Sequence, residues 1–202
     1  MASRSIGVYV EFQEEFCEQL RRLASHLATA GSGEEGYRPP SYLVRHPHLT
    51  LFHAVVRDPD LESIRKSVDR INRYCKNEPV RFLNQVKMFG DKFLFYDVVR
   101  TPMLEMAHAS AVVALLPFVD HQAAQPATKE ELTLTRSERR NLKTFGYSHV
   151  GEDYRPHVTL AFDDESSRVI KRCVSLVPPT TTFIQAVKLG IMGDYGSLQE
   201  SL

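Results

Sequence analysis

The sequence has few cysteines, no long apolar run and no excess of charge of either sign. Cys17, Cys75 and Cys173 are scattered without a C-x-x-C pair, which favours ordinary reduced thiols over a disulfide framework. The longest uncharged apolar stretch, at 111–119, contains a proline and is too short to span a bilayer. The N-terminus lacks the pattern of a signal peptide. We therefore expect a soluble cytoplasmic protein with no membrane partner.

The charges are balanced, because Lys plus Arg and Asp plus Glu number 25 each. Such a chain has no global field that would attract nucleic acid, so a nucleotide or RNA would have to be recognised by a local site. The balance favours a small or short-ended substrate over a long duplex. With 202 residues, 43% of them hydrophobic, the chain can form one globular unit or two small lobes with a core. We expect a single bilobal domain over 1–202, and a monomer.

Hydrophobic periodicity and turn residues divide the chain into alternating strands and helices. Two strands, separated by Gly90-Asp91, are expected to pair as a hairpin. Residues 31–41 are expected to form a loop, and residues 120–132 a linker or flap. The expected strands are 6–12, 48–56, 80–89, 92–99 and 181–192, with one more through the second motif described next, and the expected helices are 13–30, 58–77, 102–118, 136–146 and 164–176.

The chain contains Pro-His-x-Thr-Leu twice, within HPHLTLFH and again within PHVTLAF. On a strand, side chains two residues apart point to the same face. His48 and Thr50 therefore share one face, and His157 and Thr159 share a face in the second copy. The apolar residues between them are expected to point into the core, so each polar pair can border a cleft.

A second, weaker repeat follows each motif in the same order. FLNQVKMFGD at 82–91 is similar to FIQAVKLGIMGD at 183–194, and each comes after a His-x-Thr strand and an expected helix. Two matches in the same order predict two similar lobes related by a pseudo-twofold axis. Each lobe would offer one His-x-Thr strand to a shared cleft.

Two imidazoles and two hydroxyls in one cleft are suited to phosphoryl chemistry. Imidazole has an unperturbed pKa near neutrality, so one ring can act as base and the other as acid. Threonine hydroxyls can donate hydrogen bonds to the non-bridging oxygens of a phosphate. The alternative is a purely structural repeat, in which Pro sets the strand entry and Thr serves β-propensity. That alternative does not require His and Thr to recur together.

The paired motifs HPHLTLF and RPHVTLAF resemble the His-x-Thr signatures of the 2H phosphoesterase superfamily. The resemblance implies an α+β bilobal fold, with two pseudo-twofold-related lobes of mainly antiparallel sheet and flanking helices around a central cleft. It implies a site that needs no metal and no cofactor. His48 and His157 would form the acid–base pair, and Thr50 and Thr159 would bind phosphate. Which histidine is the acid is left open.

The leading hypothesis is a phosphodiesterase that acts on a 2′,3′-cyclic phosphate or a 2′-linked phosphodiester, with a nucleotide or short RNA as substrate. One alternative is a hydrolase of cyclic nucleotide or cyclic oligonucleotide signals, which would use the same four residues. Another is a nucleotide- or RNA-binding module without turnover. An intact His and Thr in both copies argue against the binding module, because a pure binder needs no acid–base pair.

Four further residues flank the motifs. Arg45 and Arg155 lie just before the two copies and could contact phosphate, or could simply be exposed charges. Tyr42 and Tyr154 could stack on a base, or could pack against the edge of a lobe.

A metal site is the weaker reading of the histidines around the first motif. His46 and His48 form an H-x-H with His53 close by. The second copy has no matching histidine and no carboxylate partner is obvious, so no metal is expected.

Overall fold

The computed structural model describes residues 3–29, 42–57, 59–89, 92–123, 134–162, 180–193 and 197–202. The described residues form an eight-stranded antiparallel sheet. Seven strands follow the order β2-β6-β5-β4-β7-β1-β3, and the eighth, β8, pairs with β7. The strands are β1 Arg4–Phe12, β2 Tyr42–Leu43, β3 His48–Val56, β4 Pro79–Phe89, β5 Phe93–Val98, β6 His157–Phe162, β7 Thr181–Met192 and β8 Leu198–Ser201.

Three of the described helices, α2, α3 and α5, begin at a side chain that caps the first turn. Asp60 caps α2 by accepting from the Ser63 amide, and Thr101 caps α3 ahead of a proline. Helix α5 begins with a reciprocal capping box and ends at Gly146, whose φ of 70° is in the left-handed region. The helices are α1 Glu14–Thr29, α2 Leu61–Cys75, α3 Pro102–Leu115 and α5 Arg136–Phe145, with short 3-10 turns η1 Leu116–Phe118 and η2 Gly151–Asp153.

The sheet consists of two halves that exchange a strand. β3, β1 and β7 form one half with β8, and β2, β6, β5 and β4 form the other. In chain order β4 follows the first motif and β7 follows the second, yet β4 pairs with β5 and β7 pairs with β1. The halves are joined where the ends of β4 and β7 pair over three residues each. Each sequence repeat thus contributes its last strand, β4 or β7, to the half-sheet of the other repeat. This symmetrical exchange agrees with the pseudo-twofold relation predicted from the sequence.

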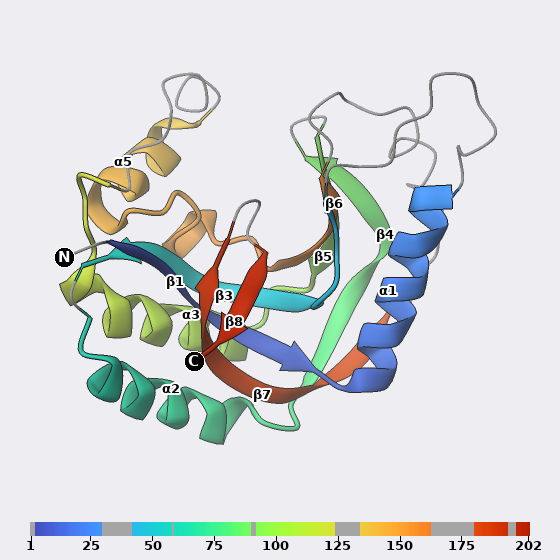
Figure 1. The fold of residues 1–202 in the computed structure, drawn as a ribbon, viewed down its shortest axis with the longest axis horizontal. Coiled ribbons are helices and arrows are strands. Elements are labelled where there is room, and N and C mark those ends of the chain that lie inside the picture. The colour runs from blue at the N-terminus through green and yellow to red at the C-terminus, as the bar shows by residue number, and fades with distance from the viewer. Residues whose placement is uncertain are drawn as a thin grey trace.

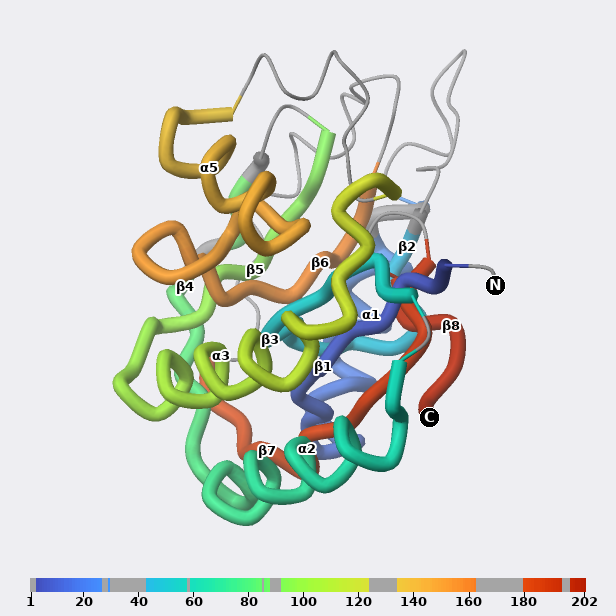
Figure 2. Tube along the Cα trace, turned by 90° about the vertical axis from the view of Figure 1, so that its left-hand side faces the viewer, coloured from blue at the N-terminus to red at the C-terminus, as the bar shows by residue number. Residues whose placement is uncertain are grey.

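The helices cover the two halves separately. α2 and α3 contact each other and pack on β7 and β3, whereas α1 contacts β2 and β6 (Figure 1). Helix α3 is mostly apolar and buries one side, which includes Leu104, Ala111 and Leu115, whereas Met106 and Val113 remain exposed. The opposite faces of β3 and β6 are thereby left without helical cover from α1, α2 or α3, and β3 and β6 contact each other (Figures 1 and 2).

The structure confirms the α+β class, the antiparallel sheet and the flanking helices. The expected strands and the expected helices at 13–30, 58–77, 102–118 and 136–146 are all present, with shifts of a few residues at their ends. The expected loop at 31–41, the Gly90-Asp91 turn, most of the 120–132 connection and the helix at 164–176 lie outside the described residues. Within the described helices, none has the length and apolarity needed to cross a membrane.

Candidate active site

The first His-x-Thr motif lies on β3, directly opposite β1. Thr50 is in register with Tyr9, and His48 is in register with Glu11. Residues opposite each other in an antiparallel pair present their side chains to the same face. A β-bulge follows at Leu51, where β3 has one residue more than β1.

The second motif repeats this arrangement on β6 and β5. Thr159 is in register with Phe95, and His157 is in register with Asp97. A bulge again follows, at Leu160. Each threonine therefore faces an aromatic ring, each histidine faces a carboxylate, and the same position in both strands is bulged. The pseudo-twofold relation predicted from the sequence extends to the residues around each motif.

The bulge in β3 changes which side chains reach the site. Strict alternation would place Phe52 on the same face as His48 and Thr50, but Phe52 is fully buried. The extra residue reverses the alternation, so His53 returns to the face of the motif and lies opposite Gly7. Burial lowers the pKa of His53 to about 4, so this imidazole is neutral at pH 7.

Both motif histidines are held in the same tautomer. Nδ1 of His48 lies 2.7 Å from the carbonyl oxygen of His46, and Nδ1 of His157 lies 2.8 Å from that of Arg155. A carbonyl oxygen can only accept a hydrogen bond, so Nδ1 carries the proton in each ring. The second nitrogen, Nε2, is then a base in the neutral ring and an acid in the charged ring.

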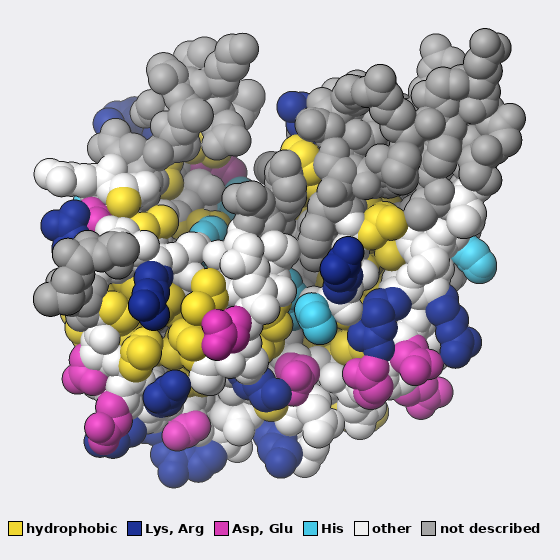
Figure 3. All heavy atoms as spheres, viewed as in Figure 1, with side chains coloured by type: hydrophobic (Ala, Val, Ile, Leu, Met, Phe, Trp, Pro, Cys, Tyr) yellow, Lys and Arg dark blue, Asp and Glu magenta, His cyan; other side chains and the backbone are white. Residues whose placement is uncertain are grey.

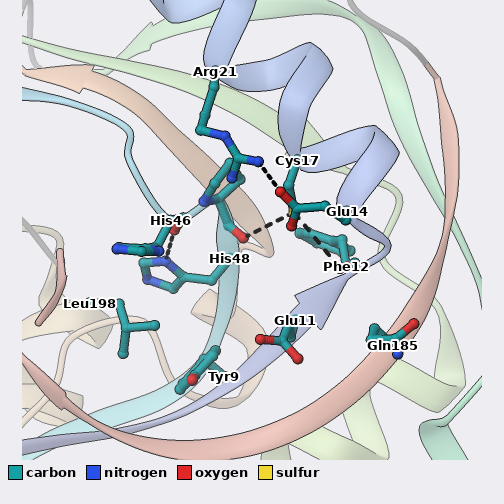
Figure 4. Close-up of a pocket in the computed structure, with 11 residues that line it drawn as sticks. Tyr9, Glu11, Phe12, Glu14, Cys17, Arg21, His46, His48, Gln185 and Leu198 are labelled. Atoms are coloured by element: carbon teal, nitrogen blue, oxygen red, sulfur yellow. Dashed lines mark hydrogen bonds and ion pairs between the residues drawn. The ribbon is translucent and has the colours of Figure 1, made fainter. Parts of the chain in front are cut away.

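His48 is 7% exposed and borders a pocket of about 330 Å3. Figure 4 shows it beside Tyr9, whose ring packs edge-on at 5.6 Å from the imidazole. The carboxylate of Glu11 forms an ion pair with Lys188 at 2.9 Å. On the α1 side, Arg21 forms an ion pair with Glu14 (Figure 4). The pocket walls thus carry charges of both signs.

His157 is partly exposed, and charged side chains surround it more closely than they surround His48. Its ring stacks on Phe95 with centroids 3.9 Å apart. Asp97 is 5% exposed and accepts three hydrogen bonds from the Arg155 guanidinium, with Lys87 at 3.6 Å. The pKa of His157 is lowered to about 4, chiefly by burial; His149 and Arg155 also lower it, and the backbone hydrogen bond and Asp97 act in the opposite direction.

The two lysines come from the weaker sequence repeat. Lys188 in FIQAVK is in register with Tyr9, and Lys87 in FLNQVK is in register with Phe95. Neither Glu11 nor Asp97 was predicted as a site residue. A third sequence repeat marks these two acids: an aromatic residue, any residue and then an acid. It reads Tyr-Val-Glu on β1 and Phe-Tyr-Asp on β5.

The segment between α5 and β6 adds polar aromatic groups near the second motif. The Tyr147 ring lies 5.1 Å from the His53 ring and 5.7 Å from that of His149. Nδ1 of His149 is 3.6 Å from a carboxylate oxygen of Glu138. These residues link the basic helix to the face that carries the motifs.

The two arginines and two tyrosines predicted to flank the motifs differ in their exposure and contacts. Arg45 is exposed in a bend before β3, and Arg155 is partly exposed and paired with Asp97. The side chain of Tyr42 is outside the described atoms. Tyr154 is 4% exposed with its ring stacked on His108 at 3.9 Å, and this burial argues against a base-stacking role for Tyr154. The cause is packing against α3, which the flanking sequence does not reveal.

The histidines around the first motif do not form a metal site in the described residues. His46 lies in the bend before β3, so only His48 of the H-x-H pair lies on that strand. The described part of the chain contains no group of three His, Cys, Asp or Glu residues that could hold a metal ion. Figure 3 shows positive and negative side chains interspersed over the described part of one face.

Comparisons with known proteins place this geometry in a family. The solved structures that this chain is similar to include E. coli LigT complexed with phosphate and E. coli LigT complexed with NADP+, with TM-scores of 0.53 and 0.52. Each is 14% identical, and the match covers all of this chain and 96% of LigT, which shows a shared fold. No curated protein matches in sequence. A family model of the 2′-5′ RNA ligase superfamily matches residues 11–186, and the chain belongs to that superfamily.

Proposed function

We propose that the protein is a metal-independent phosphodiesterase acting on a 2′,3′-cyclic phosphate or a 2′-linked phosphodiester in nucleotides or RNA ends. The family and the LigT-like fold support an activity on phosphodiesters. The observation that carries the finer proposal is the duplicated histidine geometry. In both motifs a backbone carbonyl holds the proton on Nδ1, which leaves Nε2 for proton transfer.

His157 is suited to the role of general base. Its lowered pKa keeps the ring neutral at pH 7, so Nε2 can accept a proton. In this proposal His157 takes a proton from water as the water oxygen attacks phosphorus. The new P–O bond forms as the P–O bond to one ribose oxygen breaks.

His48 then supplies the proton to the leaving ribose oxygen. It does so from Nε2 of the charged ring, and it ends the step neutral while His157 ends it charged. The Thr50 and Thr159 hydroxyls, both partly exposed, donate hydrogen bonds to the non-bridging oxygens, where negative charge builds up in the transition state. Proton exchange with water restores both rings.

Several observations favour a nucleotide-sized substrate. The pocket beside His48 is large enough for a nucleobase, and the balanced charge disfavours a long polyanion. The two LigT structures are described as complexes with phosphate and with NADP+, and both ligands carry the phosphate group that the proposed substrate carries.

The test is turnover in EDTA of 2′,3′-cyclic nucleotides, a short 2′-5′ oligonucleotide and several cyclic dinucleotides. His48→Asn and His157→Asn are the informative variants, because an asparagine amide can still donate to the backbone carbonyl near the Nδ1 position but has no Nε2. We expect each variant to lose about 10²–10⁴-fold in kcat.

His26→Ala, which removes an exposed histidine on α1, is the matched control and should keep full activity. Turnover that EDTA abolishes and added metal restores would contradict the proposal. Turnover restricted to cyclic dinucleotides would favour the hydrolase of cyclic oligonucleotide signals. Tight binding of a nucleotide without product would favour the binding module.

A further inference from the structure

A buried histidine outside the two motifs connects them. His108 lies on α3 and is 3% exposed. Its Nδ1 is 2.6 Å from the carbonyl oxygen of Leu51, and its Nε2 is 3.2 Å from the amide nitrogen of Gly151. The carbonyl accepts and the amide donates, so the ring must be neutral with its proton on Nδ1. Burial lowers the pKa of His108, which favours that neutral form.

The first bond attaches His108 to the first motif. Leu51 is the bulged residue that directly follows Thr50 on β3. A bulge leaves its extra residue outside the regular ladder, so its carbonyl needs another partner. Nδ1 of His108 supplies that partner and ties the bulge to α3.

The second bond attaches His108 to the segment that leads into the second motif. Gly151 begins the η2 turn with a φ of 64°, a conformation that favours glycine. Arg100 reinforces the turn by donating to the carbonyl oxygens of Gly151, Glu152 and Tyr154. The Tyr154 ring stacks on His108 with an interplanar angle of 10°.

From Tyr154 the chain reaches the second motif within three residues. The Arg155 carbonyl accepts from Nδ1 of His157, and the Arg155 side chain binds Asp97. A continuous series of contacts therefore runs from the bulge of β3 through His108 to the residues that orient His157. Apart from His108, the buried residues of α3 are apolar, and apolar packing sets orientation less strictly than hydrogen bonds do.

We propose that His108 is a positioning residue, which holds the two His-x-Thr motifs at the separation required for proton transfer on opposite sides of one phosphorus. This inference rests on the proposed function. Displacements of about 1 Å in a catalytic site can cost about 10²-fold in rate, so a bridge of this kind affects kcat without touching substrate.

Three variants separate the contributions of the two bonds. His108→Asn can retain a donor near the Nδ1 position, His108→Gln can retain an acceptor near the Nε2 position, and His108→Leu removes both. We expect kcat to fall by about 10–100-fold in His108→Leu, with KM within about 3-fold of wild type. The asparagine and glutamine variants should each recover part of the loss.

Val112→Ala is the matched control, since it removes buried packing one turn further along α3 without removing either bond. All variants are compared at a temperature equally far below their own Tm. Equal kcat in His108→Leu and Val112→Ala would overturn the proposal, and so would a loss that neither conservative variant recovers.

An independent readout separates this proposal from the proposed function. The imidazole resonances of His48 and His157 are followed by NMR in wild type and His108→Leu. Movement of the His157 ring resonances in His108→Leu supports the bridge. This holds even if the wild-type protein turns over none of the substrates tested, a result that would contradict only the proposed function. Resonances of both rings that stay unchanged, in a folded variant, contradict the bridge.

Discussion

At the scale of single residues, the histidines of the two motifs share a tautomer but differ in their charged surroundings. Asp97 beside His157 is buried and has two cationic neighbours, Arg155 and Lys87, whereas Glu11 beside His48 has the single neighbour Lys188 among the ion pairs of the described residues. A surplus of positive charge disfavours a second cation nearby. The asymmetry therefore distinguishes two motifs that the sequence repeats almost identically.

The acidic side of the pH–rate profile tests this asymmetry. His157 must be neutral to act as a base, so kcat/KM should stay high below the ordinary histidine pKa of 6.5 and fall only as the pH drops through about 4. Arg155→Gln removes a positive charge that disfavours protonation, so the midpoint should rise by roughly one unit. The measurement is kcat/KM between pH 3.5 and 8 under conditions where the enzyme stays folded.

Arg65→Gln, which removes an exposed charge on α2, should leave the midpoint in place. A wild-type midpoint near 6.5, or one that falls in Arg155→Gln, would show that another group controls the acidic limb.

At the scale of elements, β7 is the strand on which three others converge. It pairs with β1 along most of its length, with β4 at its start and with β8 at its end. Gly190 lies where β1, β7 and β8 meet, because it is opposite Gly7 on one side and Ser201 on the other. The side chain of Leu198 and the ring of Tyr9 pack closely against the backbone of β7 at Gly190.

Gly190→Ala should therefore destabilise the protein and lower its activity. A Cβ at this position would lie 2.7 Å from the backbone oxygen of Glu200 and 2.9 Å from a ring carbon of Tyr9. Backbone cannot give way as a flexible side chain can, so we expect a loss of about 1–3 kcal/mol in the free energy of unfolding. Tm should fall by roughly 2–4 °C for each kcal/mol, and kcat should fall because Tyr9 packs on His48.

Gly7→Ala is the matched control on the neighbouring strand. Its new Cβ would meet mainly the flexible side chain of Met192, so its loss of Tm should be smaller. A Gly190→Ala protein with the stability and kcat of wild type would mean that β8 can shift away without affecting Tyr9.

At the scale of the whole molecule, two half-sheets are joined through the short pairing of β4 with β7. Pro79, Val80 and Arg81 pair there with Phe183, Thr182 and Thr181. Thr182 is 4% exposed, and in the described part of the chain its hydroxyl has no hydrogen-bond partner. An unsatisfied hydroxyl at this junction lowers stability without contributing to the distant motifs.

Thr182→Val should raise the free energy of unfolding by about 1 kcal/mol, because valine has nearly the same shape and no hydroxyl to desolvate. Tm should rise by roughly 2–4 °C, and kcat should be unchanged. Thermal unfolding followed by calorimetry measures the shift. The neighbouring Thr181→Val, at an exposed position, should change stability by less than about 0.5 kcal/mol. A lower Tm in Thr182→Val would mean that the hydroxyl is satisfied by solvent in the folded protein.

The local sequence determined the helices and strands, and it predicted the four central residues of the candidate site. Alternation around His48 and His157 predicted the two strands, because a half-buried strand needs an apolar residue at every second position. The helical spacing of Leu61, Ile64 and Val68 predicted α2 for the equivalent reason. The repeat of the motifs then predicted two related halves, because equal local sequences adopt equal local structures.

Tertiary structure alone decided which other residues surround those four. Glu11 and Asp97 face the histidines because of strand register, which depends on pairing between segments far apart in the chain. The exchange of β4 and β7 brings Lys87 and Lys188 to the carboxylates, and packing on α3 buries Tyr154 and makes His108 a bridge. Periodicity reports whether a side chain is inside or outside, whereas long-range pairing decides which neighbour it meets there.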